Sequence, residues 1–286
     1  MNVSSILTLI GLFTSQNCFA SFSRTLKFDN LVTVHQFVGD AVIEVSSYVI
    51  ELPSKLVLID SQFSRSDALE FLKFTKNLRK PIERIIVTSA RLDHHLGADV
   101  FKNIAPIYAL TETILDITST AQFVLTNLKQ NLQQGIVPTM VTFPTKTLNE
   151  GFELIDGVLF SFTKLTKTES NANLIISLPI QKIIFPGDLV SNQVHLYLAE
   201  KNFANWINAL TVFQKNYNFF SVFLSHGMPT TSVVFQENIN YLLFTEEAYS
   251  ISTTFELFKW RMMTKFFYYK DDNILDLAKD YLYPQK

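Results

Sequence analysis

Stretches typical of β-strands alternate with stretches typical of α-helices through both halves of this 286-residue chain. The strand-like stretches are rich in β-branched residues, and the helical ones repeat apolar residues every three or four positions. Some strands follow one another closely enough to form hairpins, whereas others are separated by a helix. No Pro-, Gly- or Ser-rich linker divides the chain. The pattern predicts an α+β fold in one domain, with two mixed β-sheets packed together and helices on the outer faces.

The spacing also places the expected elements along the chain. The first expected helix has Ser64 or Ser66 as its N-terminal cap. Helices are expected at residues 64–80, 111–134 and 202–217, followed by a mostly helical tail. Strands are expected at residues 31–39, 41–52, 55–60, 82–89, 106–110, 137–143, 146–165, 173–179, 182–190 and 219–227.

The composition narrows the class of protein. Hydrophobic residues make up 48% of the chain and aromatic residues 13%, which is enough for a large core and argues against disorder. The formal net charge is only -2, and acidic and basic residues are dispersed. No basic stripe with interleaved aromatics stands out, so we expect no nucleic-acid partner.

The N-terminus predicts export. The apolar run Ile6–Phe13 is too short to span a membrane but fits the core of a signal peptide, and Ala20 ends a plausible cleavage site. No Lys or Arg precedes the run, so a disordered or strand-forming N-terminus is the alternative. We expect residues 1–20 to be a signal peptide and the mature protein to be periplasmic or secreted. The only cysteine, Cys18, would be lost with this segment, leaving no thiol and no disulfide.

Three of the expected strands end on Asp or His. Asp93 and His94 follow the strand at 82–89, Asp188 follows the strand "KIIFPG", and His226 follows "VFLS". If these strand ends converge, imidazole and carboxylate groups would form a metal site. Such a donor set suits zinc, with iron or manganese as alternatives.

The order and spacing of four motifs resemble the metallo-β-lactamase-fold superfamily of hydrolases. These motifs are "KLVLIDSQ", "TSARLDHHLGAD", "TESNANLIISLPIQKIIFPGDLV" and "LSHGMPT", and the similarity runs from about Val32 to about Thr231. The resemblance implies an αββα sandwich with the site at one edge between the sheets. It also implies that residues 21–286 form one metallo-β-lactamase-like domain, with Asp60 beside the site rather than in it.

The resemblance further implies that one of the family's two metal half-sites is degenerate. The three histidines of one half-site correspond here to Ser89, Arg91 and Glu169, of which Arg cannot bind a metal. The ligands of the other half-site are intact. We therefore expect one zinc ion, or another divalent ion, and a salt bridge in the vacated half from Arg91 to Glu169, or shared between Glu169 and Asp188. The expected metal ligands are Asp93, His94, Asp188 and His226.

Two functions remain open at this point. The first is a one-metal hydrolase of a small-molecule ester, lactone, amide or phosphoester, in which Asp188, Asp93 and Arg91 carry the catalysis. In this interpretation Asp188 orients the water or takes its proton, and Arg91 steadies an oxyanion. The alternative is a catalytically inactive secreted binding or scaffold protein on the same fold.

Other residues have structural interpretations. We expect His35 to be structural, and His95 to face solvent or pack outward. His195 is expected at the pocket mouth or on a surface loop, and Trp206 in the core. The segment Phe255–Lys270 mixes aromatic and basic residues. A packed terminal helix is the favoured interpretation of this segment, and membrane contact is the alternative.

Overall fold

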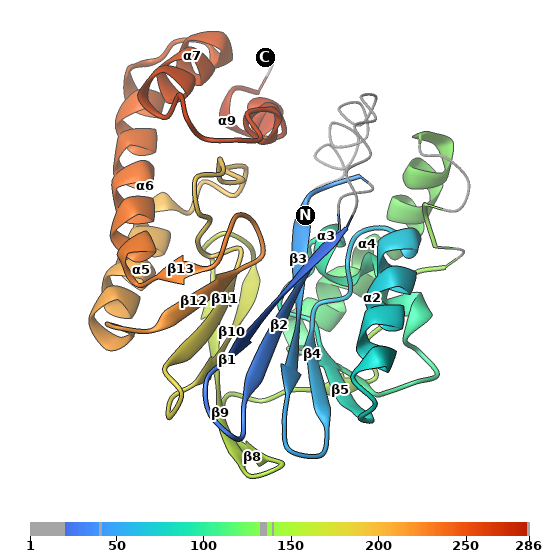
Figure 1. Ribbon diagram of the computed structural model, residues 1–286. Helices are drawn as coiled ribbons and strands as arrows, with labels where there is room; N and C mark the ends of the chain where they lie inside the picture. The colour runs from blue at the N-terminus through green and yellow to red at the C-terminus, as the bar shows by residue number, and fades with distance from the viewer. Residues whose placement is uncertain (1–20, 40–41, 132–135, 139, 285–286) are drawn as a thin grey trace.

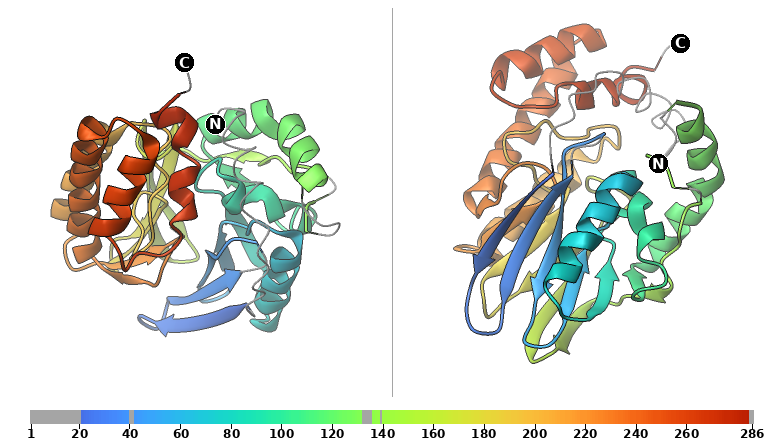
Figure 2. Two further views of the ribbon diagram at one scale, coloured as in Figure 1. Left: turned by 90° about the horizontal axis from the view of Figure 1, so that it is seen from above. Right: turned by 45° about the vertical axis from the view of Figure 1, so that its right-hand side comes forward.

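The computed structural model describes residues 21–39, 42–131, 136–138 and 140–284. The expected signal peptide at residues 1–20 lies outside these residues. Two β-sheets face each other, with α2 and α4 outside one sheet and α5 and α6 outside the other (Figure 1, Figure 2). The expected αββα sandwich of two mixed sheets is therefore confirmed.

The first sheet has seven strands in the order β1-β2-β3-β4-β5-β6-β7. Its first four strands form antiparallel hairpins, and β4 to β7 run parallel. The strands are β1 (Phe22–Lys27), β2 (Thr33–Gly39), β3 (Val45–Glu51), β4 (Leu56–Ile59), β5 (Ile82–Ile86), β6 (Ile107–Ala109) and β7 (Lys146–Thr147).

The second sheet has six strands in the order β13-β12-β11-β10-β9-β8. Only β11 and β12 pair in parallel, because α5 connects them as a crossover. The strands are β8 (Gly151–Ile155), β9 (Val158–Thr166), β10 (Ala172–Leu178), β11 (Ile183–Gly187), β12 (Ser221–Leu224) and β13 (Thr230–Thr231).

The helices follow the expected order. Ser64 caps α2 by accepting a hydrogen bond from the Asp67 backbone N–H, as predicted. The helices are α2 (Arg65–Asn77), α3 (Leu92–His95), the 3₁₀ helix η1 (Leu96–Val100), α4 (Thr111–Asn131), α5 (Phe203–Asn216), α6 (Val233–Ile251), α7 (Phe255–Lys265), α8 (Asn273–Asp276) and α9 (Lys279–Leu282).

Three apolar clusters hold these layers together. One lies between the sheets, where the rings of Tyr48, Phe185 and Phe223 contact one another at centroid distances of 5.2–5.5 Å. A second lies between the first sheet and α2 and α4, and a third lies between the second sheet and the C-terminal helices. Trp206 is buried in the third cluster, as expected for a core residue.

One expectation about strands was wrong, and one strand of the first sheet was not expected. The described residues of 137–143 form no strand, because Pro138 has no N–H to donate and Val141 packs into the core without strand pairing. The strand β1 was not predicted, since five of its six residues are exposed and show no apolar alternation. It forms only because its backbone pairs with β2 along its whole length.

Candidate metal centre

The centre forms where strands of both sheets end. In the first sheet, β5 leads through residues 87–91 into the short helix α3, which carries Asp93 and His94. In the second sheet, Asp188 directly follows β11, and His226 follows β12 by two residues. Because β11 and β12 are parallel neighbours, Asp188 and His226 emerge at the same edge. A backbone hydrogen bond of 2.8 Å from Leu174 N–H to the Thr88 carbonyl links the two sheets beside them.

Gly227, in the loop that follows β12, permits the close approach of the loop that follows β11. Gly227 has φ +88°, and a Cβ there would meet the Asn192 carbonyl oxygen at 2.3 Å. The Asn192 N–H donates to the His226 carbonyl at 3.3 Å. The residue after His226 must therefore lack a side chain if the loop after β11 is to pack against it.

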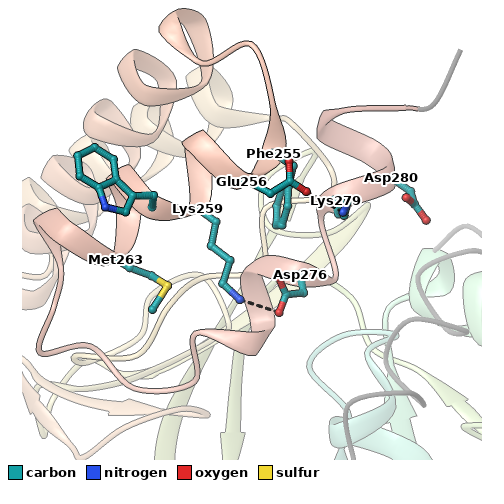
Figure 3. Close-up of a pocket in the computed structure, with 8 residues that line it drawn as sticks. Phe255, Glu256, Lys259, Met263, Asp276, Lys279 and Asp280 are labelled. Carbon is teal, nitrogen blue, oxygen red and sulfur yellow. Dashed lines mark hydrogen bonds and ion pairs between the residues drawn. The ribbon is translucent and has the colours of Figure 1, made fainter.

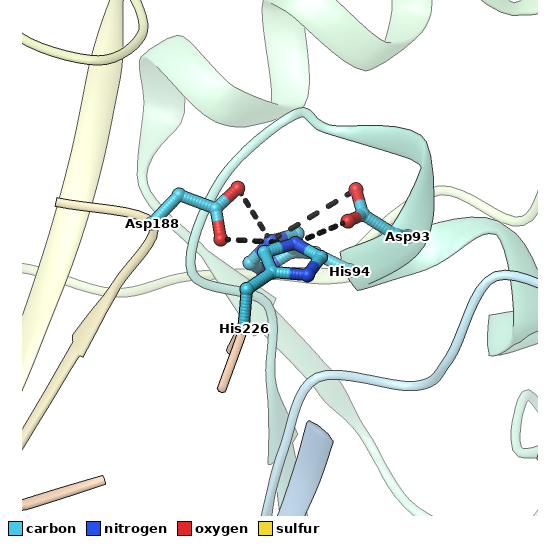
Figure 4. A group of neighbouring side chains, drawn as sticks. All are labelled: Asp93, His94, Asp188 and His226. Atoms are coloured by element: carbon cyan, nitrogen blue, oxygen red, sulfur yellow. Dashed lines mark hydrogen bonds and ion pairs between the residues drawn. The ribbon is translucent and has the colours of Figure 1, made fainter. Parts of the chain in front are cut away.

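The four expected metal ligands lie together (Figure 4). Asp93, His94, Asp188 and His226 each offer a donor atom within 4.8 Å of the others. His94 Nε2 lies 2.9 Å from Asp188 Oδ2, and His226 Nε2 lies 3.0 Å from Asp93 Oδ2. The tertiary structure thus brings together all four residues that the strand-end pattern singled out.

Hydrogen bonds at the far nitrogen orient both imidazole rings. His94 Nδ1 donates to Asp60 Oδ2 at 2.7 Å, and His226 Nδ1 donates to the Glu44 carbonyl at 3.0 Å. A carbonyl or an ionised carboxylate only accepts, so a hydrogen sits on Nδ1 and Nε2 faces the cluster, where it donates to a carboxylate when protonated and offers a lone pair to a metal when neutral. Asp60 is fixed in turn by the Thr88 backbone N–H at 2.8 Å. Asp60 therefore lies beside the site, as expected.

The charges of the cluster also fit a divalent cation. Burial raises the pKa of Asp188, but His94 and His226 outweigh it and hold that pKa well below its usual range. Burial likewise opposes the charged form of His226, yet Asp93 and Asp188 raise its pKa to about 9. Two buried carboxylates require two positive charges, which two protonated imidazoles or one divalent ion can supply. Asp188 Oδ1 is buried without a hydrogen-bond partner in the described chain, which leaves an acceptor for a metal.

The vacated half-site is filled by a salt bridge. Arg91 Nε donates to Glu169 Oε1 at 2.7 Å, and Arg91 Nη2 donates to the Glu169 carbonyl at 2.8 Å. Arg91 is 8% exposed and Glu169 1%, so the pair is desolvated. The expected pairing with Glu169 is confirmed, and among the described residues Arg91 makes no ion pair with Asp188.

The pKa of Glu169 and the pKa of Arg91 indicate different protonation states for the Glu169 carboxyl group. Burial raises the pKa of Glu169 to about 7, which favours the protonated acid. Burial would lower the pKa of Arg91, but Glu169 outweighs it and raises that pKa, which requires a charged carboxylate. The hydrogen bond of 2.7 Å from Arg91 Nε to Glu169 Oε1 has the short length typical of a guanidinium bound to a charged carboxylate. We therefore take both groups as ionised.

Two further residues contact Arg91, and no pattern in the sequence predicted them. The Arg91 guanidinium lies 4.0 Å from the Tyr197 ring centroid, and Arg91 Nη2 lies 3.6 Å from Glu200 Oε1. Both residues belong to the irregular segment after β11, where no motif or periodicity marks them. Arg91 is thus held in one orientation from three sides.

Two histidine expectations were wrong. His95 is 2% exposed, because the tight turn of α3 directs it into the molecule rather than to solvent. His195 is also 2% exposed and lies 2.8 Å from the Tyr241 hydroxyl through Nδ1. The C-terminal segment covers it, since the His195 N–H donates to the Lys270 carbonyl. His35, by contrast, is structural as expected and bonds Thr25 and Glu51.

Comparisons with known proteins agree with this geometry. A sequence model of the metallo-beta-lactamase superfamily matches residues 41–215. A solved metallo-beta-lactamase from Pontibacter korlensis is similar with a TM-score of 0.62 and 19% identity, covering 78% of this chain and 99% of that chain. The metallo-beta-lactamase IND-7 is similar with a TM-score of 0.60 and 16% identity, covering 77% of this chain and 98% of that chain. No curated protein matches in sequence. At these identities the likeness to solved structures concerns the fold.

Proposed function

We propose that this chain, which belongs to the metallo-beta-lactamase superfamily, is a metal-dependent hydrolase that works with a single divalent ion. The observation that carries the proposal is the cluster of Asp93, His94, Asp188 and His226, with both imidazole Nε2 atoms directed into it. Two nitrogen and two carboxylate donors suit zinc best among the common divalent ions. Glu169 is outside the cluster, which supports one ion rather than two.

The two half-sites have different roles in the proposed hydrolysis. A divalent ion held by the cluster would supply Lewis acidity and lower the pKa of a bound water toward neutrality. Asp188 has one oxygen on His94 Nε2 and a second without a hydrogen bond, so the second oxygen can bind the ion or accept a hydrogen bond that orients an attacking water. Arg91 provides a fixed positive charge beside these groups, and its Nη1 makes no hydrogen bond within the described chain. That N–H group can stabilise an oxyanion on the substrate.

We propose a small-molecule ester, lactone, amide or phosphoester as the substrate. These groups share an electrophilic carbonyl or phosphoryl centre and develop negative charge on oxygen, which Arg91 can stabilise. We also propose that residues 1–20 direct export and that residues 21–286 act in the periplasm or outside the cell. The short apolar run and the small residue at position 20 support this localisation.

Metal analysis of the purified chain tests the single-ion proposal. We expect about one equivalent of divalent metal per chain, because one complete ligand set makes one site. His226→Ala should abolish binding, whereas Ser89→Ala, at a residue of the vacated half, should leave it unchanged. Metal content of two equivalents, or none after supplementation with zinc, would contradict the proposal. Hydrolysis of a panel of esters, lactones, amides including a β-lactam, and phosphoesters then tests the reaction.

The alternative, an inactive binding or scaffold protein, is favoured by one observation. The Arg91–Glu169 salt bridge occupies the half-site that would otherwise hold a second metal. If the loss of that metal is what removed activity, changing Ser89, Arg91 and Glu169 together to His should add a second equivalent of metal and create hydrolysis that the natural chain lacks. If the natural chain already hydrolyses a member of the panel, the scaffold alternative is wrong.

A further inference from the structure

The metal centre is built from both sheets. Asp93 and His94 follow β5 of the first sheet, whereas Asp188 and His226 follow strands of the second sheet. The distance of 3.0 Å from His226 Nε2 to Asp93 Oδ2 therefore depends on how the two sheets are held against each other. A group that binds the end of β12 to the first sheet also sets the place of His226.

The backbone of β3 makes two such bonds. Strand β4 ends opposite Tyr48, so the edge of β3 before Tyr48 has no β4 partner. The Ser46 N–H donates from this edge to the Ser225 carbonyl at 2.9 Å, and the Glu44 carbonyl accepts from His226 Nδ1 at 3.0 Å. Alternate residues of a strand direct their backbone groups to the same side. The chain after β12 thus occupies the edge that β4 leaves free.

The Tyr48 side chain adds a third bond at the same place. Its hydroxyl donates to the carbonyl of Leu224, the last residue of β12, at 2.5 Å. The Tyr48 ring is buried between the sheets against two phenylalanine rings, at centroid distances of 5.2 and 5.5 Å. Residues 224–226 are thus each bound to residues 44–48. We call these three hydrogen bonds the β3–β12 contact.

A buried chain of hydrogen bonds fixes the direction of the Tyr48 hydroxyl. Gln36 Nε2 on β2 donates to Ser46 Oγ at 2.9 Å, and the Ser46 side chain hydrogen-bonds Tyr48. Burial raises the pKa of Tyr48 and outweighs the contact with Ser46, so the hydroxyl stays protonated. Because a carbonyl only accepts, Tyr48 donates its hydrogen to Leu224 and accepts one from Ser46.

We propose that Tyr48 is a positioning residue of the metal centre, which acts through the Leu224 carbonyl to place His226. The inference rests on the proposed metal site, because Tyr48 itself makes no hydrogen bond to any of the four ligands within the described chain. The other backbone bond between the sheets near the centre, from the Leu174 N–H, holds β10. The end of β12 therefore depends on the β3–β12 contact.

The variant Tyr48→Phe tests this role, because it removes the hydroxyl and keeps the ring in the core. We expect the affinity for zinc, measured by competition with a chelator, to fall by about tenfold, since His226 is then held less firmly. The visible absorption bands of the cobalt-loaded chain should also change, because they depend on the arrangement of the ligands around the ion. A merely structural role would lower stability and leave these bands unchanged.

A second tyrosine provides the matched control. The Tyr249 hydroxyl on α6 also donates to a leucine carbonyl, that of Leu282 at the end of α9, at 3.0 Å. Helices α7 and α9 border a groove lined by Phe255, Lys279 and the exposed Trp260 (Figure 3). No helix in the described part of the chain is long and apolar enough to span a membrane, and these C-terminal helices pack on the second sheet. Tyr249→Phe should keep zinc affinity within about twofold of the natural value and leave the cobalt bands unchanged.

Hydrogen exchange tests the β3–β12 contact without relying on the variant's metal affinity. In the metal-free chain, Tyr48→Phe should speed exchange of the Ser46 N–H more than Tyr249→Phe does. The Ile85 N–H, which bonds the Pro106 carbonyl at 3.0 Å elsewhere in the first sheet, corrects for global unfolding. In the natural chain, zinc should slow exchange of the Ser46 N–H, because coupling between two parts of a protein is reciprocal.

The outcomes separate this inference from the proposed function. Equal zinc affinities and cobalt bands in Tyr48→Phe and Tyr249→Phe would overturn the role of Tyr48. If Tyr48→Phe does not fold, the natural chain decides, and a Ser46 N–H that exchanges equally with and without zinc counts against the proposal. If the natural chain binds no metal, the proposed function fails. Exchange in the metal-free variants then decides on the β3–β12 contact, which equal Ser46 rates in both would refute.

Discussion

Replacing Arg91 by Met should destabilise the protein by about 3–5 kcal/mol, because the buried Glu169 carboxyl group then has no cation and must either stay charged or take up a proton. Glu169 is 1% exposed, and its Oε2 already lacks a hydrogen bond in the described chain. The substitution also removes the donor to the Glu169 carbonyl oxygen. Glu200 contributes little to this cluster, since its contact with Arg91 is 3.6 Å long and its side chain is one-third exposed. Glu200→Gln should therefore cost less than about 1 kcal/mol.

A second ion pair of this chain provides the control. Arg84 binds Glu153 through two hydrogen bonds of 2.9 and 2.8 Å, and its guanidinium lies over the Tyr108 ring. Both arginine side chains are 9% exposed, but the Glu153 side chain is 42% exposed and the Glu169 side chain 2%. In Arg84→Met the carboxylate returns to water, so the loss of the ion pair should cost less than about 1 kcal/mol. The difference between the two variants isolates the cost of stranding a buried charge.

Urea unfolding at pH 7 measures both free energies. The measurement should be made with and without EDTA, because loss of metal would otherwise add to the effect. The double change Arg91→Met with Glu169→Leu should recover most of the stability, since an apolar pair of similar volume carries no desolvation cost. Equal losses in Arg91→Met and Arg84→Met would refute the reasoning, and so would a double variant no more stable than Arg91→Met.

Three further predictions concern other parts of the molecule. Asp60→Asn should weaken metal binding by about 10–100-fold by loosening His94, as metal titration would show; unchanged affinity would exclude this role. Asn tolerates the left-handed backbone of this residue, φ 59°, so the fold should survive. Burial lowers the pKa of His195 to about 4 from 6.5, so unfolded chains bind the proton first and stability should fall as the pH drops from about 6.5 toward 4. His195→Gln should remove that part of the pH dependence in urea unfolding, and an unaltered profile would contradict it. Export predicts a mature N-terminus at Ser21 in the native host, and an intact Met1 on cytoplasmic protein would disprove it.

Most of the metal centre could be predicted from the sequence because its ligands follow strands. A strand that ends in Asp or His places that side chain at a sheet edge, whichever other strands surround it. Asp93, His94, Asp188 and His226 were all found in this way, and the structure brings them together. The pairing of Arg91 with Glu169 followed from the resemblance, which places both residues in one half-site, and from charge, because two opposite charges in one closed volume must compensate each other.

Only the tertiary structure decided the contacts that no local pattern encodes. The Glu44 carbonyl orients His226 from 182 positions away in the sequence, and Tyr197 and Glu200 reach Arg91 from an irregular segment. His195 is buried because the chain near Lys270 returns over it, and β1 exists because β2 offers it an unpaired edge. Periodicity reports which side of an element is apolar, but not which distant backbone will cover it. The exposure of Trp260 and Phe267 was likewise decided by packing, since α7 could bury only one of its two apolar sides against the core.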